Sequence, residues 1–268
     1  MKSFAYHKPT SPAEAVALLG SIEESRALSG GMTLLPTMKM RLATPEALID
    51  LSEVEGISGI RAGNGVVTIG AMTRHAEVAA SAAVREAIPA LAALAAGIGD
   101  PQVRHRGTIG GSLANADPAA DYPAGVVGLK ATIVTDRREI PAGEFFKGLF
   151  ETALAHDEII TAVRFPVPEF AGYAKFKNPA SRFAIVGVFV AKTGDEVTVA
   201  VTGAGPSVFR SPEVEEALSA SFAPGALASV SVDSAGLNSD IHADSEYRAH
   251  LIVAMARRAV SSALAGAA

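Results

Sequence analysis

The sequence predicts an α+β protein, with short strands and helices mixed along the chain. Three observations lead to this fold class. Short apolar runs with the properties of strands alternate with helical segments over residues 4–51. Asn64-Gly65 separates two further apolar runs, as in a β-hairpin. Near the C-terminus, Tyr247, Leu251 and Met255 recur at a spacing of four, which is typical of an amphipathic helix.

Composition limits the possible functions. Of the 268 residues, 49% are hydrophobic and 19% are charged, so the chain can bury a sizeable core. The net charge of −5 supplies no basic field, so nucleic acid is not an expected partner. The chain contains no cysteine, so it has neither disulfides nor thiolates for an iron–sulfur cluster. Its six histidines lack the spacing of metal ligands, and we expect no metal site.

No transmembrane segment is expected. The longest uncharged apolar run, residues 87–99, is shorter than the roughly 20 residues that a membrane helix needs. The first residues, MKSFAYHKPTSP, contain no apolar stretch of signal-peptide length. We therefore expect a soluble cytoplasmic protein.

The first 56 residues predict a small α+β unit. A helix is expected from Ser11-Pro12 to about Leu19, because a capping hydroxyl and a proline at the first position favour a helix start. The expected strands are residues 4–6, 26–29 and 47–51, and residues 34–41 are expected to be helical. The strand 26–29 ends abruptly at Gly30-Gly31.

A second unit begins with the hairpin strands 57–61 and 66–70. Helices are expected at residues 73–80, 84–98 and 122–130, and strands at 129–135 and 158–165. Between them, residues 99–121 are rich in Gly, Asp and Pro and show no clear period. A long irregular stretch inside a compact domain is usually functional, so we expect ligand chemistry there.

Pro166-Val167-Pro168 is the best candidate for a linker. Beyond it, residues 183–192 and 196–202 predict a hairpin, and residues 245–263 predict the C-terminal helix. We therefore divide the chain into residues 1–165, with subdomains of about 1–56 and 57–165, and a second domain at residues 169–268.

Two glycine-rich segments are candidates for binding phosphate. The first contains Ser29, Gly30, Gly31, Met32 and Thr33. Adjacent glycines after a strand let backbone N–H groups approach a phosphate, and the Thr33 hydroxyl adds a donor. A tight strand-to-helix turn explains the same pattern, and the double glycine alone favours that simpler interpretation.

The second glycine segment runs from Gly107 to Asn115 and is followed by Asp121. Its small residues with Thr, Ser and Asn provide neutral donors suited to a pyrophosphate. Asp121 has two equally common interpretations: it accepts hydrogen bonds from ribose hydroxyls, or it caps the helix that follows. Neither segment has the spacing of a Rossmann or Walker motif, which disfavours a nicotinamide or nucleoside triphosphate site of those types.

Together, SGGMTLLPTMKMRLA and GDPQVRHRGTIGGSLANADPAADYPA resemble the flavoprotein (medium) subunits of the molybdenum hydroxylase family, of the carbon monoxide dehydrogenase and xanthine dehydrogenase type. Members typically show A-G-G-Q/H-S-L-L-P-x-M-K followed by R-G-T-I/L-G-G-N/S-x-A-x-x-D-P-x-x-D. The resemblance extends from FAYHKPTSPAEAVALL to SEYRAHLIVAMARRAV, which is nearly the whole chain.

The resemblance implies an FAD-binding domain of the vanillyl-alcohol oxidase (PCMH) type in two α+β subdomains. It also implies a small C-terminal α+β domain with a three-stranded sheet. The implied FAD contacts are Ser29, Gly30, Gly31, Met32, Thr33, Ile98, Gly99, Thr108, Ile109, Gly110, Gly111, Ser112, Asn115, Asp121 and Lys177. In this interpretation, the two glycine segments wrap the pyrophosphate.

Two positions depart from the family pattern. Met32 stands where relatives often have Gln or His, which removes a polar side chain beside the flavin. Phe183 follows Ser181-Arg182, where many relatives carry Asp-Tyr or Asp-Ile before the alanine. Both departures leave the flavin's redox tuning open.

The resemblance implies electron transfer as the function of this chain, with hydroxylation on a large subunit that holds the molybdenum cofactor. A small subunit would hold 2Fe-2S clusters, and the complex would be a heterohexamer, a dimer of heterotrimers. FAD suits this position because a flavin accepts single electrons and releases pairs. The acceptor is NAD, a quinone or oxygen, and the substrate belongs to the large subunit.

Two other functions compete with electron transfer. A self-contained FAD-dependent oxidoreductase needs a substrate domain, and only about 100 residues follow the linker. A flavin-free assembly or binding protein would have no need of Gly30, Gly31, Gly110, Gly111 and Asp121. The basic cluster Arg104-His105-Arg106 has three possible interpretations: a solvated loop, a subunit contact, or electrostatic support for the flavin phosphates.

Overall fold

The N-terminal unit contains a three-stranded parallel sheet in a computed structural model that describes residues 1–266. Its strands β1 (Ala5–His7), β3 (Ala47–Asp50) and β2 (Ser25–Leu28) lie in that order, with α1 (Pro12–Ser21), α2 (Leu34–Lys39) and the short helix η1 (Leu51–Glu53) beside them. The expected capping at Ser11 is present, since its hydroxyl accepts the Glu14 N–H at 3.2 Å.

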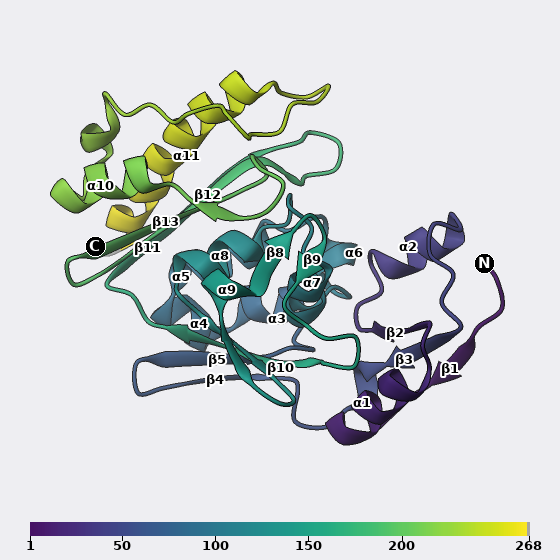
Figure 1. Ribbon diagram of the computed structural model, residues 1–268. Helices are drawn as coiled ribbons and strands as arrows, with labels where there is room; N and C mark the ends of the chain where they lie inside the picture. Colours follow the sequence, from purple (N-terminus) through teal and green to yellow (C-terminus); the bar gives the residue numbers. More distant parts are fainter. Residues whose placement is uncertain (267–268) are drawn as a thin grey trace.

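The middle unit is built on a five-stranded antiparallel sheet in the order β4-β5-β10-β6-β7, of which Figure 1 labels β4, β5 and β10. The strands are β4 (Ile60–Gly63), β5 (Val66–Gly70), β10 (Ile160–Pro166), β6 (Thr132–Thr135) and β7 (Glu139–Pro141). The remaining elements are α3 (His75–Ala80), α4 (Ala82–Ala87), α5 (Pro89–Ala96), α6 (Pro101–Arg104), α7 (Ile109–Asn115), α8 (Tyr122–Gly128), α9 (Ala142–Phe145), β8 (Phe146–Gly148) and β9 (Glu151–Thr152).

Three predictions for this unit were wrong in detail. The helix expected over residues 84–98 breaks at Ile88, whose backbone (φ −142°) avoids the helical region because Pro89 follows it. The first hairpin strand begins at Ile60 rather than Ile57, after Gly59 adopts a left-handed φ of +99°. The stretch 99–121, expected to be irregular, contains α6 and α7, so the second glycine pair lies in the first turn of a helix.

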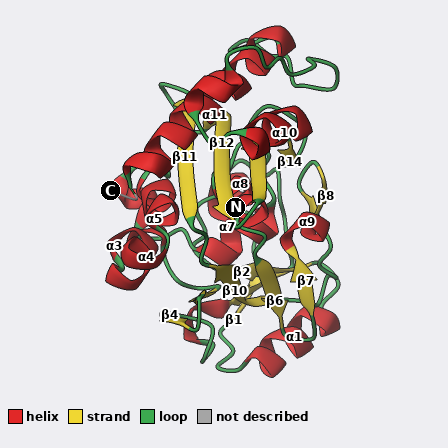
Figure 2. Ribbon diagram, turned by 90° about the vertical axis from the view of Figure 1, so that its left-hand side faces the viewer, coloured by secondary structure: helices red, strands yellow, loops and turns green. Residues whose placement is uncertain are grey.

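The C-terminal unit contains an antiparallel sheet of four strands, β11 (Phe170–Lys177), β12 (Ala184–Thr193), β13 (Glu196–Thr202) and β14 (Phe209–Arg210). The resemblance implied three strands, and the difference is the two-residue β14 at one edge. Helix α11 (Ser245–Ala265) crosses β11 and β12, as Figure 2 shows, with α10 (Pro212–Ala220) and η2 (Pro224–Leu227) nearby. The opposite face of the sheet packs on α5 and α8.

One hydrophobic core therefore joins the middle and C-terminal units. Phe189 of β12 is fully buried in the same cluster as Tyr122 and Leu91. A Cβ on Gly128 would lie 2.8 Å from the Phe189 ring, so the glycine permits the close approach of α8 and β12. The division into two domains near residue 166 stays a prediction. Within residues 1–266, no helix is long and apolar enough to cross a bilayer.

Candidate cofactor site

A cavity of about 620 Å³ opens where the three units meet. Its walls are formed by the strand β2 and the loop after it, by α7 and the segments around it, and by the loop between β11 and β12. The predicted site residues that line it are Ser29, Gly30, Gly31, Met32, Thr33, Ile98, Gly99, Thr108, Gly110, Gly111, Ser112, Asn115 and Asp121. Residues far apart in sequence are thus gathered around one space.

Two predicted site residues lie away from this lining. Ile109 is fully buried in the core of the middle unit. Lys177 is exposed at the end of β11. A cofactor contact through either residue stays a prediction, and a different lysine, Lys175, is the one close to the cavity wall.

The glycines allow the two segments to approach each other closely. A Cβ on Gly30 would lie 2.4 Å from the carbonyl oxygen of Arg106, and one on Gly111 would lie 2.4 Å from Ser29 Oγ. The hydroxyls of Ser29 and Thr108 are 3.0 Å apart and share a hydrogen bond. A Cβ at Gly30 would meet backbone and force the segments apart, and one at Gly111 would displace the Ser29 and Thr108 hydroxyls. The sequence pattern therefore has a structural cause as well as a cofactor interpretation.

The first segment presents free backbone donors. Among the hydrogen bonds within residues 1–266, none uses the N–H groups of Gly30, Gly31, Met32 or Thr33 as a donor. Gly31 has a φ of +71°, and successive N–H groups beside a left-handed residue form the concave arrangement that binds anions. This segment fits a pyrophosphate.

The second segment differs from this expectation, because its backbone donors are already used. The Ile109 and Gly110 N–H groups donate to the carbonyls of Thr73 (3.1 Å) and Ala71 (2.8 Å). The Gly111 N–H donates to Thr108 Oγ1 at 3.1 Å. Side chains remain for a ligand: Ser112 and Asn115, three residues apart on one face of α7, line the cavity.

Asp121 does not cap helix α8, so that interpretation was wrong. Its carboxylate instead accepts the Tyr173 hydroxyl and the Lys175 ammonium, which lies 2.9 Å from Oδ1. Both charged side chains are nearly inaccessible, at 4% for Asp121 and 8% for Lys175. Burial raises the pKa of the Asp121 carboxyl, and the Lys175 charge opposes that rise. The ribose interpretation of Asp121 stays a prediction.

Two buried polar atoms near the cavity have no hydrogen-bond partner among the described residues: His75 Nδ1 and the Tyr122 hydroxyl. The two rings are 5.3 Å apart, and His75 lines the cavity. Burial, helped by the charge of Arg104, lowers the pKa of His75 to about 4. His75 is therefore neutral at physiological pH.

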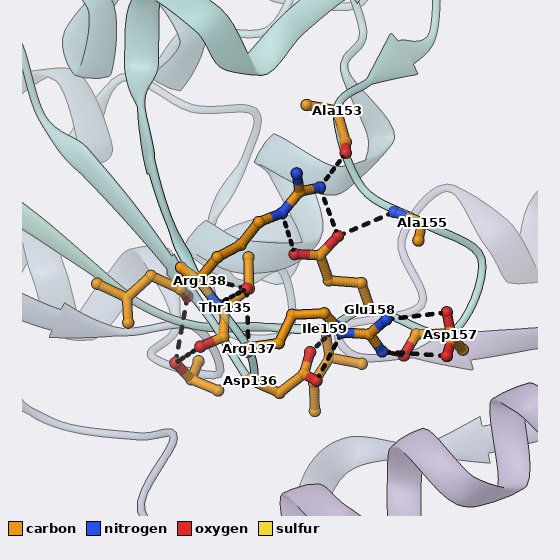
Figure 3. Close-up of polar contacts among 11 residues, drawn as sticks. Thr135, Asp136, Arg137, Arg138, Ala153, Ala155, Asp157, Glu158 and Ile159 are labelled. Carbon is orange, nitrogen blue, oxygen red and sulfur yellow. Dashed lines mark hydrogen bonds and ion pairs between the residues drawn. The ribbon is translucent and has the colours of Figure 1, made fainter.

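A polar cluster around Arg138 and Glu158 holds the backbone at Ala153 and Ala155, as Figure 3 shows, and Glu158 itself lines the cavity. Arg138 donates through Nε to Glu158 Oε1 at 2.8 Å and through NH2 to Oε2 at 2.7 Å. Glu158 Oε2 also accepts the Ala155 N–H at 3.0 Å, and Arg138 donates to the Ala153 carbonyl. The bond to Arg138 lowers the pKa of Glu158 to about 2.

Several lining residues were missed by the sequence reasoning, including Phe150, Leu154, Glu158 and Arg182. Their positions carry no local motif, because they reach the cavity only through the pairing of distant strands. In the basic cluster Arg104-His105-Arg106, His105 and Arg106 are exposed, whereas Arg104 is not simply solvated. This half-buried guanidinium donates to the carbonyls of Ile98 (2.9 Å) and Gly99 (3.1 Å) and so holds that wall.

Comparisons with known proteins agree with this geometry. Residues 2–168 match the family described as the FAD binding domain in molybdopterin dehydrogenase. The chain is 36% identical to the nicotine 6-hydroxylase medium subunit of Paenarthrobacter nicotinovorans, over 98% of each chain. It is also 36% identical to the carbon monoxide dehydrogenase medium chain of Hydrogenophaga pseudoflava, over 98% of this chain and 97% of that one.

Solved structures show the same similarity in three dimensions. A chain of the reconstituted CO dehydrogenase from Oligotropha carboxidovorans superposes with a TM-score of 0.88 at 33% identity, and the match covers 98% of both chains. A chain of quinoline 2-oxidoreductase from Pseudomonas putida 86 gives a TM-score of 0.87 at 27% identity, covering 100% of this chain and 99% of that one. The α+β fold with its glycine-lined cavity belongs to an oxidoreductase subunit, and the chain is a member of the family of FAD-binding domains in molybdopterin dehydrogenases.

Proposed function

We propose that this chain is the electron-transferring FAD subunit of a heteromeric molybdenum hydroxylase. It takes electrons from 2Fe-2S clusters on a partner subunit and passes them to an external acceptor. The single observation that carries this proposal is the cavity in which both glycine segments meet, within a chain of this family. The relatives named as medium subunits of hydroxylases and dehydrogenases support it.

The residues present fit FAD. The free N–H groups of Gly30 to Thr33 suit the pyrophosphate, and the hydroxyl of Ser112 and the amide of Asn115 supply further polar contacts. The absence of a Cβ at Gly30 and Gly111 lets the two segments approach each other, which brings both to the same cavity. When bound, FAD supplies the capacity to accept electrons singly and release them in pairs.

The chain itself orients the cofactor and shields part of it from water. Met32, Phe150 and Phe183 are partly exposed apolar side chains that line the cavity. Neutral His75 adds a wall group that carries no charge. No cysteine occurs in the sequence, so the iron–sulfur clusters of the proposed pathway belong to another chain.

The partners in this proposal are a large subunit with the molybdenum cofactor and a small subunit with the clusters. The assembly is a dimer of heterotrimers in the cytoplasm. The name of one relative, the medium chain of carbon monoxide dehydrogenase, supports a complex of unequal subunits. We further propose that Ser29–Thr33, Ile98-Gly99, Thr108–Ser112, Asn115, Asp121 and Lys177 contact FAD.

The test is to purify the complex from its native source and to identify the subunits, flavin and metals. We expect three different chains, with one FAD for each copy of this one. The isolated chain, loaded with FAD, should pass electrons from a chemical reductant to an acceptor yet oxidise no organic substrate. Substrate oxidation by the isolated chain would instead favour a self-contained oxidoreductase, and absence of flavin from both preparations would favour an assembly protein.

A further inference from the structure

Lys175 of β11 lies at the meeting point of three segments of the cavity wall. Its ammonium donates to the carbonyl of Gly97 (3.0 Å), to Asp121 Oδ2 (3.0 Å) and to the carbonyl of Arg182 (3.1 Å). An ammonium has three N–H donors, so each donor has an acceptor. The acceptors come from the end of α5, the start of α8 and the loop between β11 and β12.

Each acceptor is part of the cavity wall or adjoins it. Gly97 precedes Ile98 and Gly99, both of which line the cavity, and Asp121 and Arg182 line it themselves. Lys175 is not among the lining residues. It therefore holds the wall from behind, without reaching the space that a ligand would occupy.

The surroundings make this arrangement sensitive to the loss of the lysine. The Lys175 side chain is 8% exposed and that of Asp121 is 4% exposed, so water cannot readily replace either partner. Removing one member of a buried ion pair leaves an uncompensated charge and is strongly destabilising. Tyr173 donates a second hydrogen bond to Asp121, which holds the carboxylate but leaves Gly97 and Arg182 untied.

We propose that Lys175 is a positioning residue for the cofactor cavity. From the C-terminal sheet it fixes the wall segments at Gly97, Asp121 and Arg182 at the spacing that FAD requires. This inference rests on the proposed binding of FAD in this cavity. It makes the C-terminal unit necessary for the geometry of the site, beyond any contact of its own with the cofactor.

The test begins with Lys175→Met in the full chain. FAD is titrated into apoprotein, the dissociation constant is taken from flavin fluorescence, and the visible circular dichroism of the bound flavin is recorded. We expect FAD to bind roughly tenfold more weakly or worse, with an altered dichroism spectrum, because a misplaced wall changes the flavin environment. Lys175→Arg, which keeps the charge and the donors, should recover part of both signals.

The matched control is Lys192→Met on the neighbouring strand β12, outside the cavity lining. Its FAD affinity and dichroism should equal those of the wild type. If Lys175→Met does not fold, the double variant Lys175→Met/Asp121→Asn removes both buried charges. Its amide hydrogen exchange should rise around residues 97–99 and 182–183, while the β11–β12 ladder stays protected.

Wild-type FAD affinity and dichroism in a folded Lys175→Met protein would overturn the inference. An increase in exchange spread evenly over β11 and β12 would also overturn it, because that result shows a general loss of stability. If the wild-type chain itself binds no FAD, the proposed function fails first. The two failures are therefore distinguishable.

Discussion

Ser29 and Thr108 share a hydrogen bond across 79 positions of sequence, with 3.0 Å between their hydroxyl oxygens. The same Thr108 oxygen accepts the Gly111 N–H at 3.1 Å. One threonine therefore caps helix α7 and ties it to the loop after β2. The Cβ missing from Gly111 leaves the space that the Ser29 hydroxyl occupies.

Gly111→Ala should break the hydroxyl pair that joins the two glycine segments and weaken FAD binding. The new Cβ would lie 2.4 Å from Ser29 Oγ and 2.9 Å from Thr108 Oγ1, so the hydroxyl pair must break. In a helix, alanine is otherwise more favourable than glycine by roughly 1 kcal/mol. Any loss of stability in this variant is therefore due to the steric contact. Fluorescence titration and urea unfolding of the apoprotein measure the two effects.

The double variant Ser29→Ala/Gly111→Ala separates these causes. Removing the Ser29 hydroxyl takes away the shortest contact of the new methyl group and leaves Thr108 Oγ1 at 2.9 Å and the Ser29 Cβ at 3.7 Å. The double variant should therefore be more stable than Gly111→Ala, as expected for coupled neighbours, although the contact with Thr108 Oγ1 remains. If the double variant is no more stable than Gly111→Ala, the contact with Ser29 is not the cause.

The pH dependence of stability should include a contribution from His75. Its pKa is about 4 in the folded protein and near 6.5 when exposed, so the unfolded chain binds the proton more readily between these values. The free energy of unfolding therefore has its full value, as far as His75 is concerned, above about pH 6.5. It falls as the pH is lowered towards 4, because the unfolded chain then takes up a proton that the folded protein does not. About 2 kcal/mol should be lost between pH 6.5 and 5.

Urea unfolding of apoprotein across this range tests the prediction. His75→Gln cannot take up the proton, so its stability should vary less over the same interval. The exposed histidine variant His242→Gln serves as the control and should follow the wild type. If the stability of His75→Gln changes with pH as steeply as that of the wild type, other groups cause the pH dependence.

Arg138→Met should weaken both the fold and FAD binding. The variant leaves Glu158, whose side chain is 1% exposed, without its cation and frees the segment 149–156 at the cavity. The folded pKa of Glu158 is about 2, so its contribution is present above about pH 4.5 and is lost as the pH falls towards 2. We expect urea unfolding at pH 7 to show a lower stability than the wild type, because the buried Glu158 carboxylate loses its cation.

Arg137→Met is the matched control for this experiment. Arg137 pairs with Asp157, and both side chains are well exposed (39% and 40%), so solvent screens the pair. Urea unfolding at pH 7 should show a smaller loss of stability for this variant than for Arg138→Met. Equal losses of stability in Arg137→Met and Arg138→Met would contradict the argument that the burial of Glu158 makes its ion pair the more important one.

The sequence predicted which residues line the cavity better than it predicted their hydrogen-bond and ion-pair partners. Gly30 and Gly111 were found because a missing Cβ next to a strand or helix start is a local signal. The partners of the buried Asp121 were not found, because Tyr173 and Lys175 lie 52 and 54 positions away and reach it through tertiary packing. No local pattern distinguishes a carboxylate that caps a helix from one that accepts an ammonium.

The same reasoning explains the errors in the fold. The break at Ile88 had a local signal in Pro89, which disfavours a helical conformation at the preceding residue. The use of the Gly110 N–H by the Ala71 carbonyl had none, because it depends on the approach of β5 to α7. Propensity identifies where a chain turns, while the packing of distant segments decides which backbone donors stay free.

The ion pair between Asp121 and Lys175 also restricts how such chains can be recombined. The turn between Pro166 and Phe170 is the natural place to join halves of two relatives in a chimera. A junction there takes the carboxylate from one parent and the ammonium from the other. Parents that differ at either position would yield a chimera with a buried, unmatched charge behind its cavity, however well the two halves fold.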